Sequence, residues 1–556
     1  MKLKNIFLAA FCAAVMGANA QNYINPMDHP TVLSASFAEL RANHFHGGLD
    51  ISTPHVGMPV KSVADGYVSR IKVSPYGYGY GLYITHYDGH TTVYGHLSEY
   101  APKIDSVIRK EQYRLQSFDV DYYPDESQLP VKQGEIVAYS GNTGGSLGPH
   151  LHLEVRDTKT DDPLNPLAYL AKGVADHRAP TVYGIKVYAM DDTSAADQKY
   201  YELKSIENKT IDAYGHIGFG INAVDFFDVG GRPCGVVEVS LYDNDNLVFQ
   251  SRLERVPFDK TRYINSFVDF DEVQSHNRYI QKSFIDPNNH LDIYKVCKPI
   301  IVKTNEMHKI RYELKDFVGN TRKVSFNVRG VAADNFTMPK PSGNKVLWSQ
   351  DYVSFDYGMV VHIPAGNFYK DEYVEFARVD SNVYNRPLYT VGRRGIPIHD
   401  HFMLMLPVPE DYKRMLSDST LKSSQVFIAR TGKKNSYSYV GGTIDGDNIS
   451  VNPRIMGDFL VAIDTVPPRV VSKNSATLLS QNNNVMVGIS DNMSGIAKYN
   501  CYIDGEWKIF EYDYKNARLI SPVKKLGLKS GAHTLVAKIE DACGNLTEWE
   551  WKFRVK

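Results

Sequence analysis

The stretch "GLYITHYDGHTTVYGHL", Gly81–Leu97, contains two runs of alternating apolar and polar residues on either side of Asp88-Gly89. Aromatic and β-branched residues fit the pleated surface of a strand, and Asp-Gly is typical of the tight turn between two antiparallel strands. We therefore expect a β-hairpin here. From about Ser36 to Leu170 similar short runs continue without a convincing long amphipathic helix, which predicts an all-β fold.

The chain has 556 residues, too many for one hydrophobic core, and roughly one domain per 150 residues leads us to expect three to five domains. Its hydrophobic fraction of 43% is ordinary for folded domains. The 62 basic and 63 acidic residues nearly cancel, so no overall field draws the protein to nucleic acid or anionic lipid.

The N-terminus has the layout of a secretory signal. Lys2 and Lys4 precede an apolar run, and the small residues "ANA" end at Ala20. We expect residues 1–20 to be removed on export, so that the mature protein is periplasmic or secreted. The apolar run is too short to span a bilayer, and no later segment is long and apolar enough to predict a membrane span.

The cysteines leave two alternatives open. Removal of the signal also removes Cys12, and four cysteines then remain, Cys234, Cys297, Cys501 and Cys543. An exported protein with an even number of cysteines permits disulfides, of which Cys234 with Cys297 and Cys501 with Cys543 are the simplest. Four free or buried thiols are the other alternative, because a sequence gives no distances.

Changes in composition and in strand pattern along the chain predict four domains after the signal, at residues 21–178, 179–331, 332–465 and 466–556. The first has an insertion near residues 100–130, for which a solvated loop with a short helix and a substrate-contacting lid are both open. The second and fourth share a pattern, because "DFVGN" at 316–320 and "DACGN" at 541–545 both follow an alternating apolar run. This pattern predicts the closing hairpin of a β-sandwich in each.

Chemistry-bearing residues gather in three segments of the first domain. "NHFHGGLD" contains His46 and Asp50, "VYGHL" contains His96, and "GNTGGSLGPHLHLEV" contains His150 and His152. If the last segment ends in a strand, alternation places His150 and His152 on one face. Four histidines and an aspartate suit a zinc ion that keeps one position for water and lowers its pKa, with the remaining histidines available for proton transfer.

These motifs, together with "GMPVKSVADGYVSRI" and "PLNPLAYL", resemble the M23 family of zinc metallopeptidases over about residues 40–170. The resemblance implies that His46, Asp50 and His152 bind Zn²⁺. It also implies that His150 is the general base and that His96 polarises the carbonyl or stabilises the oxyanion. No ligand is missing, in contrast to degenerate relatives that activate amidases.

The fold implied is an M23-type, duplicated-hybrid-motif-like β-sheet peptidase domain followed by about three Ig-like β-sandwich modules. The function implied is hydrolysis of the stem peptides or cross-bridges of peptidoglycan. A non-enzymatic cell-wall-binding or regulatory protein on the same scaffold is the alternative, and iron oxygenase chemistry is disfavoured by the spacing and by export. The β-sandwich tail could bind a protein partner, target the enzyme or make an autoinhibitory contact.

Several further residues have open roles. His44 is expected to support the ligands or to lie at the rim of the site, and His86 and His90 flank the hairpin turn without an assigned role. Glu154 shares a face with the histidines, where orienting one of them and facing solvent are both open. Arg41 is a suggestion for a residue near the substrate.

Overall fold

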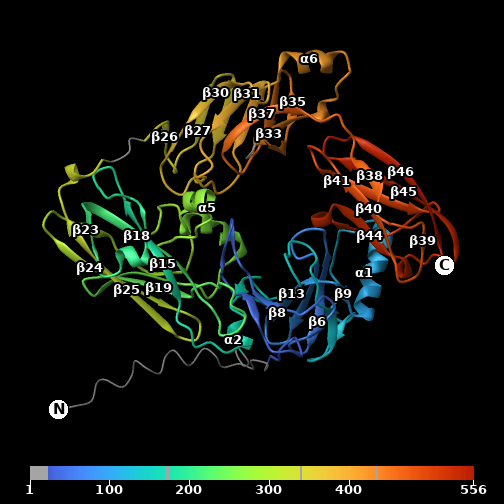
Figure 1. Ribbon diagram of the computed structural model, residues 1–556, viewed down its shortest axis with the longest axis horizontal. Helices are drawn as coiled ribbons and strands as arrows, with labels where there is room; N and C mark the ends of the chain where they lie inside the picture. The colour runs from blue at the N-terminus through green and yellow to red at the C-terminus, as the bar shows by residue number, and fades with distance from the viewer. Residues whose placement is uncertain (1–22, 171–173, 338–340, 433–435) are drawn as a thin grey trace.

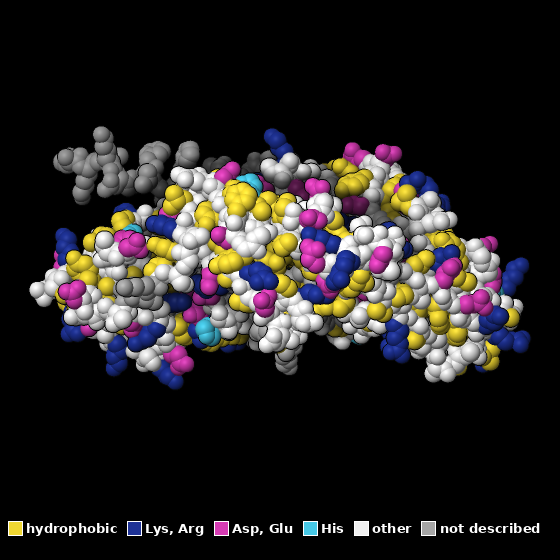
Figure 2. All heavy atoms as spheres, turned by 90° about the horizontal axis from the view of Figure 1, so that it is seen from above, with side chains coloured by type: hydrophobic (Ala, Val, Ile, Leu, Met, Phe, Trp, Pro, Cys, Tyr) yellow, Lys and Arg dark blue, Asp and Glu magenta, His cyan; other side chains and the backbone are white. Residues whose placement is uncertain are grey.

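The computed structural model describes residues 23–170, 174–337, 341–432 and 436–556. Figure 1 shows a ring of β-sheet domains, in which the C-terminal domain, drawn in red, returns to the N-terminal domain, drawn in blue. The chain is 46% strand and 11% helix, which confirms the predicted all-β class. The signal predicted at residues 1–20, with Cys12, lies outside the described residues. On the face seen in Figure 2, basic and acidic side chains are interspersed, in keeping with a net charge of −1.

The first domain is built on a nine-stranded sheet. In the order of the sheet its strands are β1 (Leu33–Ala35), β4 (Leu49–Ser52), β13 (His150–Asp157), β8 (His90–Leu97), β7 (Tyr80–His86), β6 (Gly66–Val73) and β10 (Val120–Tyr122), with β11 (Pro130–Val131) beside β6 and β14 (Pro163–Leu164) beside β13. β7 and β8 form the predicted hairpin, and Gly89 takes a positive φ of 88° in its turn.

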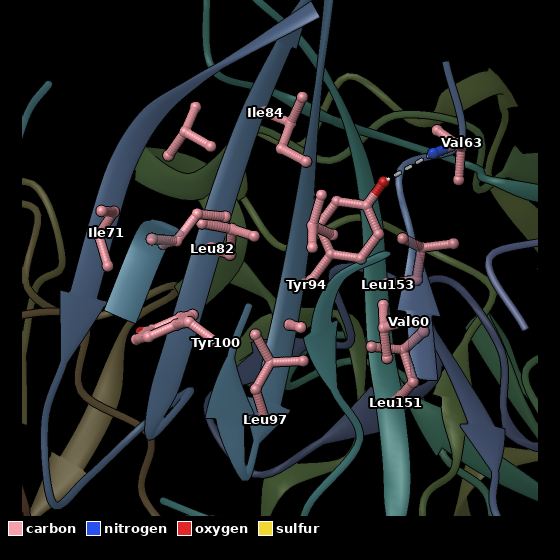
Figure 3. Packing of buried hydrophobic residues seen from close by; sticks show 14 of the residues in the cluster. Val60, Val63, Ile71, Leu82, Ile84, Tyr94, Leu97, Tyr100, Leu151 and Leu153 are labelled. Carbon is pink, nitrogen blue, oxygen red and sulfur yellow. Dashed lines mark hydrogen bonds between the residues drawn. The ribbon is translucent and has the colours of Figure 1, made fainter. Parts of the chain in front are cut away.

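The core of this domain lies between the large sheet and a small sheet of β5 (Pro59–Lys61), β12 (Ile136–Tyr139) and β9 (Glu99–Tyr100). Figure 3 shows Tyr94 at its centre, where the Val63 backbone N–H donates to the Tyr94 hydroxyl oxygen at 3.0 Å. Leu151 and Leu153 of β13 are fully buried in this core. The alternation along β13 therefore puts the histidines of that strand on the opposite face.

The insertion contains a helix of 14 residues, longer than the short helix that one of the two alternatives expected. α1 (Pro102–Leu115) begins with a proline, which needs no hydrogen-bond partner for its nitrogen there, and ends at Gln116 in the left-handed conformation. Ile104 and Ile108 are buried in the core of the domain, and Val107 packs against it. Within the described residues no helix is both long and apolar enough to cross a membrane.

Each of the three later domains has two large β-sheets around its own buried cluster, and the third also has a two-stranded sheet of β26 (Asn344–Val346) and β29 (Glu372–Val374). The second contains β15 (Thr181–Ala189) and β18 (Gly215–Val224) in one sheet and β19 (Glu238–Asp243), β24 (Met307–Lys315) and β25 (Thr321–Gly330) in the other. The third contains β28 (Met359–Ile363) and β32 (Met403–Pro407), facing β33 (Val426–Thr431) and β37 (Gly457–Ile463). The fourth contains β40 (Asn484–Ser490) and β44 (Arg518–Pro522), facing β41 (Ile496–Ile503), β45 (Gly531–Asp541) and β46 (Leu546–Val555). The Ig-like assignment of these domains stays a prediction.

The second domain shares a hydrophobic cluster with the first. Phe37 and Phe45 are buried with Phe267 of α4 (Ile264–Phe267), and the Phe45 and Phe267 rings are 5.7 Å apart. The Phe45 backbone N–H also donates to the Thr261 hydroxyl at 2.9 Å. The segment that carries the first histidine motif is therefore fixed partly by the second domain.

Of the two alternatives for the cysteines, the structure agrees with free thiols, because all four described cysteines are unpaired. Cys234 is buried in the cluster of the first domain, whereas Cys297 is exposed on β22 (Tyr294–Cys297). Cys501 is buried in the core of the fourth domain, and Cys543 belongs to a different cluster with residues of the third. Each thiol thus belongs to a separate environment, so the pairs suggested by chain order do not meet.

Candidate metal centre and active site

The three predicted ligands converge on one point. β4 and β13 are antiparallel neighbours, and their register places His152 directly opposite Asp50. His46, in the loop before β4, reaches the same point. The distances are 3.1 Å from His46 Nε2 to Asp50 Oδ1, 3.1 Å from His46 Nε2 to His152 Nδ1 and 2.8 Å from His152 Nδ1 to Asp50 Oδ1.

The spacing of these atoms fits a zinc ion. In a tetrahedral site with bonds of about 2.0–2.1 Å, ligand atoms lie roughly 3.3 Å apart. The three distances between the ligand atoms are slightly shorter than this and nearly equal. Small movements of the side chains away from one another would therefore give the coordination geometry. Two imidazoles and one carboxylate leave a fourth position for water, which is the composition of a catalytic site.

The remaining nitrogen of each ligand histidine is tied to an acceptor. His46 Nδ1 donates to the Ser36 carbonyl oxygen at 2.7 Å, and His152 Nε2 donates to Glu154 Oε1 at 2.8 Å. These bonds place the proton of each neutral ring away from the cluster and aim a lone pair into it. The fold therefore favours the tautomer that zinc requires, although His152 must still release the second proton that its raised pKa allows it to hold.

His96 and His150 stand beside the cluster with their ring centroids 4.8 Å apart. His96 Nδ1 donates to the Thr143 carbonyl oxygen at 2.9 Å, and His150 Nδ1 donates to the Gly148 carbonyl oxygen at 2.9 Å. In both rings Nε2 is then an acceptor. His150 Nε2 is buried without a hydrogen-bond partner and lies 3.4 Å from Asp50 Oδ1, so it faces the place where a water molecule would be activated.

The backbone near His96 is held in a sparsely populated conformation. His96 has a positive φ of 58°, which costs free energy for a residue with a side chain. Its N–H donates to the Tyr78 carbonyl oxygen at 2.8 Å, so the segment before β7 holds the strand end in place. This conformation directs the ring towards the Thr143 carbonyl and the cluster.

Several ionisable side chains in and beside the cluster have pKa values far from their usual range. Burial lowers the pKa of His152, but hydrogen bonds to Asp50 and Glu154 outweigh it and raise that pKa to about 9. Burial raises the pKa of Glu154, yet the charge of Arg156 and the bond to His152 hold it at about 2. Burial, followed by the charges of two neighbouring imidazoles, lowers the pKa of His96 to about 3. His96 is therefore neutral near pH 7, as a proton acceptor must be.

A glycine-rich loop, residues 141–148, forms one edge of the site. A side chain at Gly144 would meet the Gly77 carbonyl oxygen at 2.3 Å, so only glycine allows this close approach of two loops. The C-terminal domain touches the loop from outside. Lys515 Nζ donates to the carbonyl oxygens of Asn142 and Ser146 at 2.5 and 2.9 Å, and the Tyr514 hydroxyl donates to that of Gly144 at 3.5 Å.

Comparison with known proteins identifies the domain that carries this geometry. Residues 44–113 match the family model of peptidase family M23, and residues 343–464 match that of a Zu5-like domain. The N-terminal domain is an M23 peptidase domain. His96 lies inside the matched span, whereas His150 and His152 lie after it.

The curated relatives are similar to this M23 domain and not to the whole chain. The DD-carboxypeptidase/endopeptidase Mpg of Neisseria meningitidis is 32% identical over 123 residues, which are 22% of this chain and 22% of that protein. The peptidoglycan DD-endopeptidase ShyB of Vibrio cholerae is 36% identical over 110 residues, 20% of each chain.

Among solved structures, the catalytic domain of lysostaphin from Staphylococcus simulans is 24% identical. It covers 25% of this chain and 92% of that one, with a TM-score of 0.20.

Sequence reasoning missed two residues of the M23 domain that support the cluster. Arg156 donates to Glu154 Oε2 from Nε at 2.7 Å, and the Tyr78 hydroxyl donates to Glu154 Oε1. Glu154 is fully buried between them and His152, so the solvent-facing alternative for this residue is wrong. Arg156 continues the alternating face of His152 and Glu154, a signal that was present in the sequence. Tyr78, in a loop, gave no such signal.

The other residues singled out from the sequence lie around or away from the M23 centre. His44 is exposed, and its Nδ1 donates to the Ala42 carbonyl oxygen at 2.9 Å. Arg41 Nη2 donates to Asp50 Oδ2 at 3.4 Å, which places the guanidinium beside a predicted ligand. His86 bonds within the sheet, and His90 bonds to the Tyr169 hydroxyl, so both have structural partners.

Proposed function

We propose that this protein is an exported, zinc-dependent endopeptidase that hydrolyses peptide cross-links of bacterial peptidoglycan. The observation that carries the proposal is the convergence of His46, Asp50 and His152, whose ligand atoms lie within 4.8 Å of one another, beside the unpartnered Nε2 of His150. A binding module has no need of a buried acceptor aimed at a metal-binding cluster. The M23 match and the similarity to ShyB, which is named a peptidoglycan DD-endopeptidase, support the same substrate class.

The residues of the site have two kinds of role, binding the zinc ion and transferring protons. His46, Asp50 and His152 would hold the zinc ion, which, when bound, lowers the pKa of a water molecule to about 7 and polarises the scissile carbonyl. His150 accepts a proton at Nε2, because its Nδ1 is committed to the Gly148 carbonyl oxygen. It then returns that proton to the leaving amine.

The role of His96 differs from the one implied by resemblance. Its neutral ring donates from Nδ1 to the Thr143 carbonyl oxygen, so Nε2 accepts a hydrogen bond and cannot donate one to an oxyanion. We therefore assign His96 to orienting the attacking water through Nε2. Oxyanion stabilisation by His96 would require that the ring first take up a proton.

The bond cut is proposed to be the D-alanyl–diaminopimelate cross-link, and the location periplasmic or secreted. The relatives named as DD-endopeptidases support the bond, and the signal-like N-terminus supports export. A thin peptide with small side chains suits an edge formed by a glycine-rich loop.

Digestion of purified sacculi tests the proposal, with muropeptides identified by mass spectrometry. Native protein should convert cross-linked dimers to monomers, zinc-stripped protein should not, and zinc should restore the reaction. His150→Ala should bind zinc and leave the dimers intact. His55→Ala is a matched control, because His55 is an exposed histidine of the same domain. Unchanged cross-linking with zinc-loaded native protein would instead favour a wall-binding or regulatory role.

A further inference from the structure

The second and fourth domains repeat one arrangement of aspartates. In the turn between β24 and β25, Asp316 Oδ1 accepts from the backbone N–H of Gly319 at 2.7 Å and of Asn320 at 2.9 Å. In the turn between β45 and β46, Asp541 Oδ1 accepts from the N–H of Asn545 at 2.9 Å. The sequence repeat therefore builds the same turn twice and fixes one aspartate in each.

A second aspartate precedes the first strand of each domain and is attached to that turn. The Asn320 amide donates to the Asp176 carbonyl oxygen at 3.3 Å, and the Asn545 amide donates to the Asp464 carbonyl oxygen at 3.0 Å. A third aspartate follows β18 or β40, at Asp225 and Asp491. The two resulting groups are Asp176, Asp225 and Asp316, and Asp464, Asp491 and Asp541, with one oxygen of each member within 4.8 Å of the others.

In the second domain this group contains carboxylate oxygens with no partner. Asp225 Oδ1 and Asp176 Oδ2 are buried and accept no hydrogen bond, and the exposed fractions of these residues are only 2% and 8%. Asp316 is 4% exposed. Among the described residues, no lysine, arginine or histidine forms an ion pair with any of the three, although the charge of Arg178 acts on Asp225. Burying three carboxyl groups without a paired cation is costly, and the nearby charge of Arg178 offsets the effect of burial on the pKa of Asp225 only in part, so protons or a bound cation would relieve that cost.

The fourth domain shows how the same group can be satisfied differently. The Ser494 hydroxyl and N–H both donate to Asp464 Oδ2, at 2.7 and 3.1 Å. Asp491 Oδ1 is the unpartnered oxygen there, on a side chain that is only partly buried. Of these two groups, the one in the second domain contains two buried residues that each carry an oxygen without a hydrogen-bond partner.

We propose that Asp176, Asp225 and Asp316 bind a divalent cation, Ca²⁺, at the junction between the M23 domain and the second domain. All the converging atoms are carboxylate oxygens, the ligands that hard cations prefer, and Ca²⁺ tolerates irregular geometry better than Mg²⁺. Without a cation, burial and the neighbouring carboxylates raise the pKa of Asp176 to about 6 and that of Asp225 to about 7. A bound cation removes this penalty.

The proposed calcium site is connected through hydrogen bonds to Ser36, which contacts the predicted zinc ligand His46. The backbone groups of Asp225 and Cys234 are hydrogen-bonded in both directions, at 3.0 and 2.8 Å. The next residue, Gly235, donates its N–H to the Ser36 hydroxyl at 2.9 Å, and the Ser36 carbonyl accepts from His46. A cation held by Asp225 would therefore stabilise the Cys234–Gly235 segment, which contacts Ser36, the residue whose carbonyl oxygen accepts a hydrogen bond from His46.

Calcium uptake by the full-length, zinc-loaded chain tests the proposal. Equilibrium dialysis against CaCl₂ should show a bound ion that Asp225→Asn removes and that Asp491→Asn, the matched change in the fourth domain, retains. Calcium should also raise the Tm of the wild-type protein and of Asp491→Asn, but not that of Asp225→Asn. Asparagine keeps the side-chain shape and supplies an amide donor to its neighbours, so folding should be preserved.

Two results would overturn the proposal. One is the absence of calcium uptake by the wild-type chain together with a higher Tm for Asp225→Asn, because shared protons would then satisfy the carboxylates. The other is retention of the ion by Asp225→Asn. Should Asp225→Asn fail to fold, Asp176→Asn replaces it, and uptake by the wild-type chain still decides the matter.

Discussion

Replacing Glu154 with glutamine tests whether the buried network behind His152 prepares it to bind zinc. The carboxylate is fully buried, accepts from His152 Nε2 at 2.8 Å and accepts from Arg156 at 2.7 Å. In Glu154→Gln the amide oxygen can still accept from His152. The amide NH₂ then faces the guanidinium of Arg156, and two hydrogen-bond donors cannot bond to each other. Arg156 is left without its buried anion, although the exposed Asp161 remains 3.0 Å away.

The expected magnitudes follow from these contacts. Removing one partner of a buried ion pair costs about 3–5 kcal/mol of unfolding free energy, and the Asp161 contact places this case near the lower end. Changing a carboxylate that orients a metal-binding histidine lowers metal affinity by about 10–100-fold. Zinc affinity is measured by competition with a chelator, and stability by urea unfolding of the metal-free protein.

A matched variant separates the two effects. Glu238→Gln removes a buried carboxylate of the second domain that pairs with Arg252 at 3.2 Å, so it should lower stability and leave zinc affinity unchanged. A folded Glu154→Gln variant that binds zinc within twofold of the wild-type affinity would show that Glu154 does not prepare His152 for the metal.

Four further changes have defined outcomes. His150→Ala should keep zinc and lose about 10²–10⁴-fold in turnover of a cross-linked muropeptide, and unaltered turnover would exclude it as the base. Lys515→Ala removes the hydrogen bonds that Lys515 donates to the glycine-rich loop, and it should raise cleavage of sacculi if the C-terminal domain restrains that loop. Equal or lower cleavage would contradict this restraint. In the metal-free fold the pKa of His152 is about 9, above the unfolded value of about 6.5, so its proton stabilises that fold at low pH and is lost as pH rises through about 9. Zinc must displace this proton, so the increase in Tm caused by zinc should grow between about pH 6 and pH 9, and a flat profile would argue against the assignment. Cys297 is exposed and should react with a thiol reagent in the native protein, while buried Cys501 should react only after unfolding.

The sequence was informative where the chemistry depends on strand periodicity. Alternation along "HLHLEV" was enough to put His152 on a face opposite to Leu151, because a strand repeats every two residues. The motif resemblance supplied the partners, since nothing in the spacing of residues 46, 50 and 152 shows that β4 and β13 are neighbours. Non-local pairing is a property of the folded sheet and has no local signature.

Other features were decided by contacts between distant segments. The apolar face of α1 is short, with Ile104, Val107 and Ile108 on the core. The helix also contacts the C-terminal domain, where Arg109 donates to the Lys525 carbonyl oxygen at 3.0 Å. Likewise, Asp225 carries no motif of its own. It becomes notable only because folding buries it beside two other carboxylates.

The central claim is that one zinc ion is held by His46, Asp50 and His152. Diffraction from crystals of the zinc-loaded protein, recorded on both sides of the zinc absorption edge, measures this directly. We expect one strong anomalous peak in the M23 domain at about 2.0–2.2 Å from Nε2 of His46, Oδ1 of Asp50 and Nδ1 of His152. A peak bound by other residues, or no peak at this position in a preparation that cleaves sacculi, would contradict it.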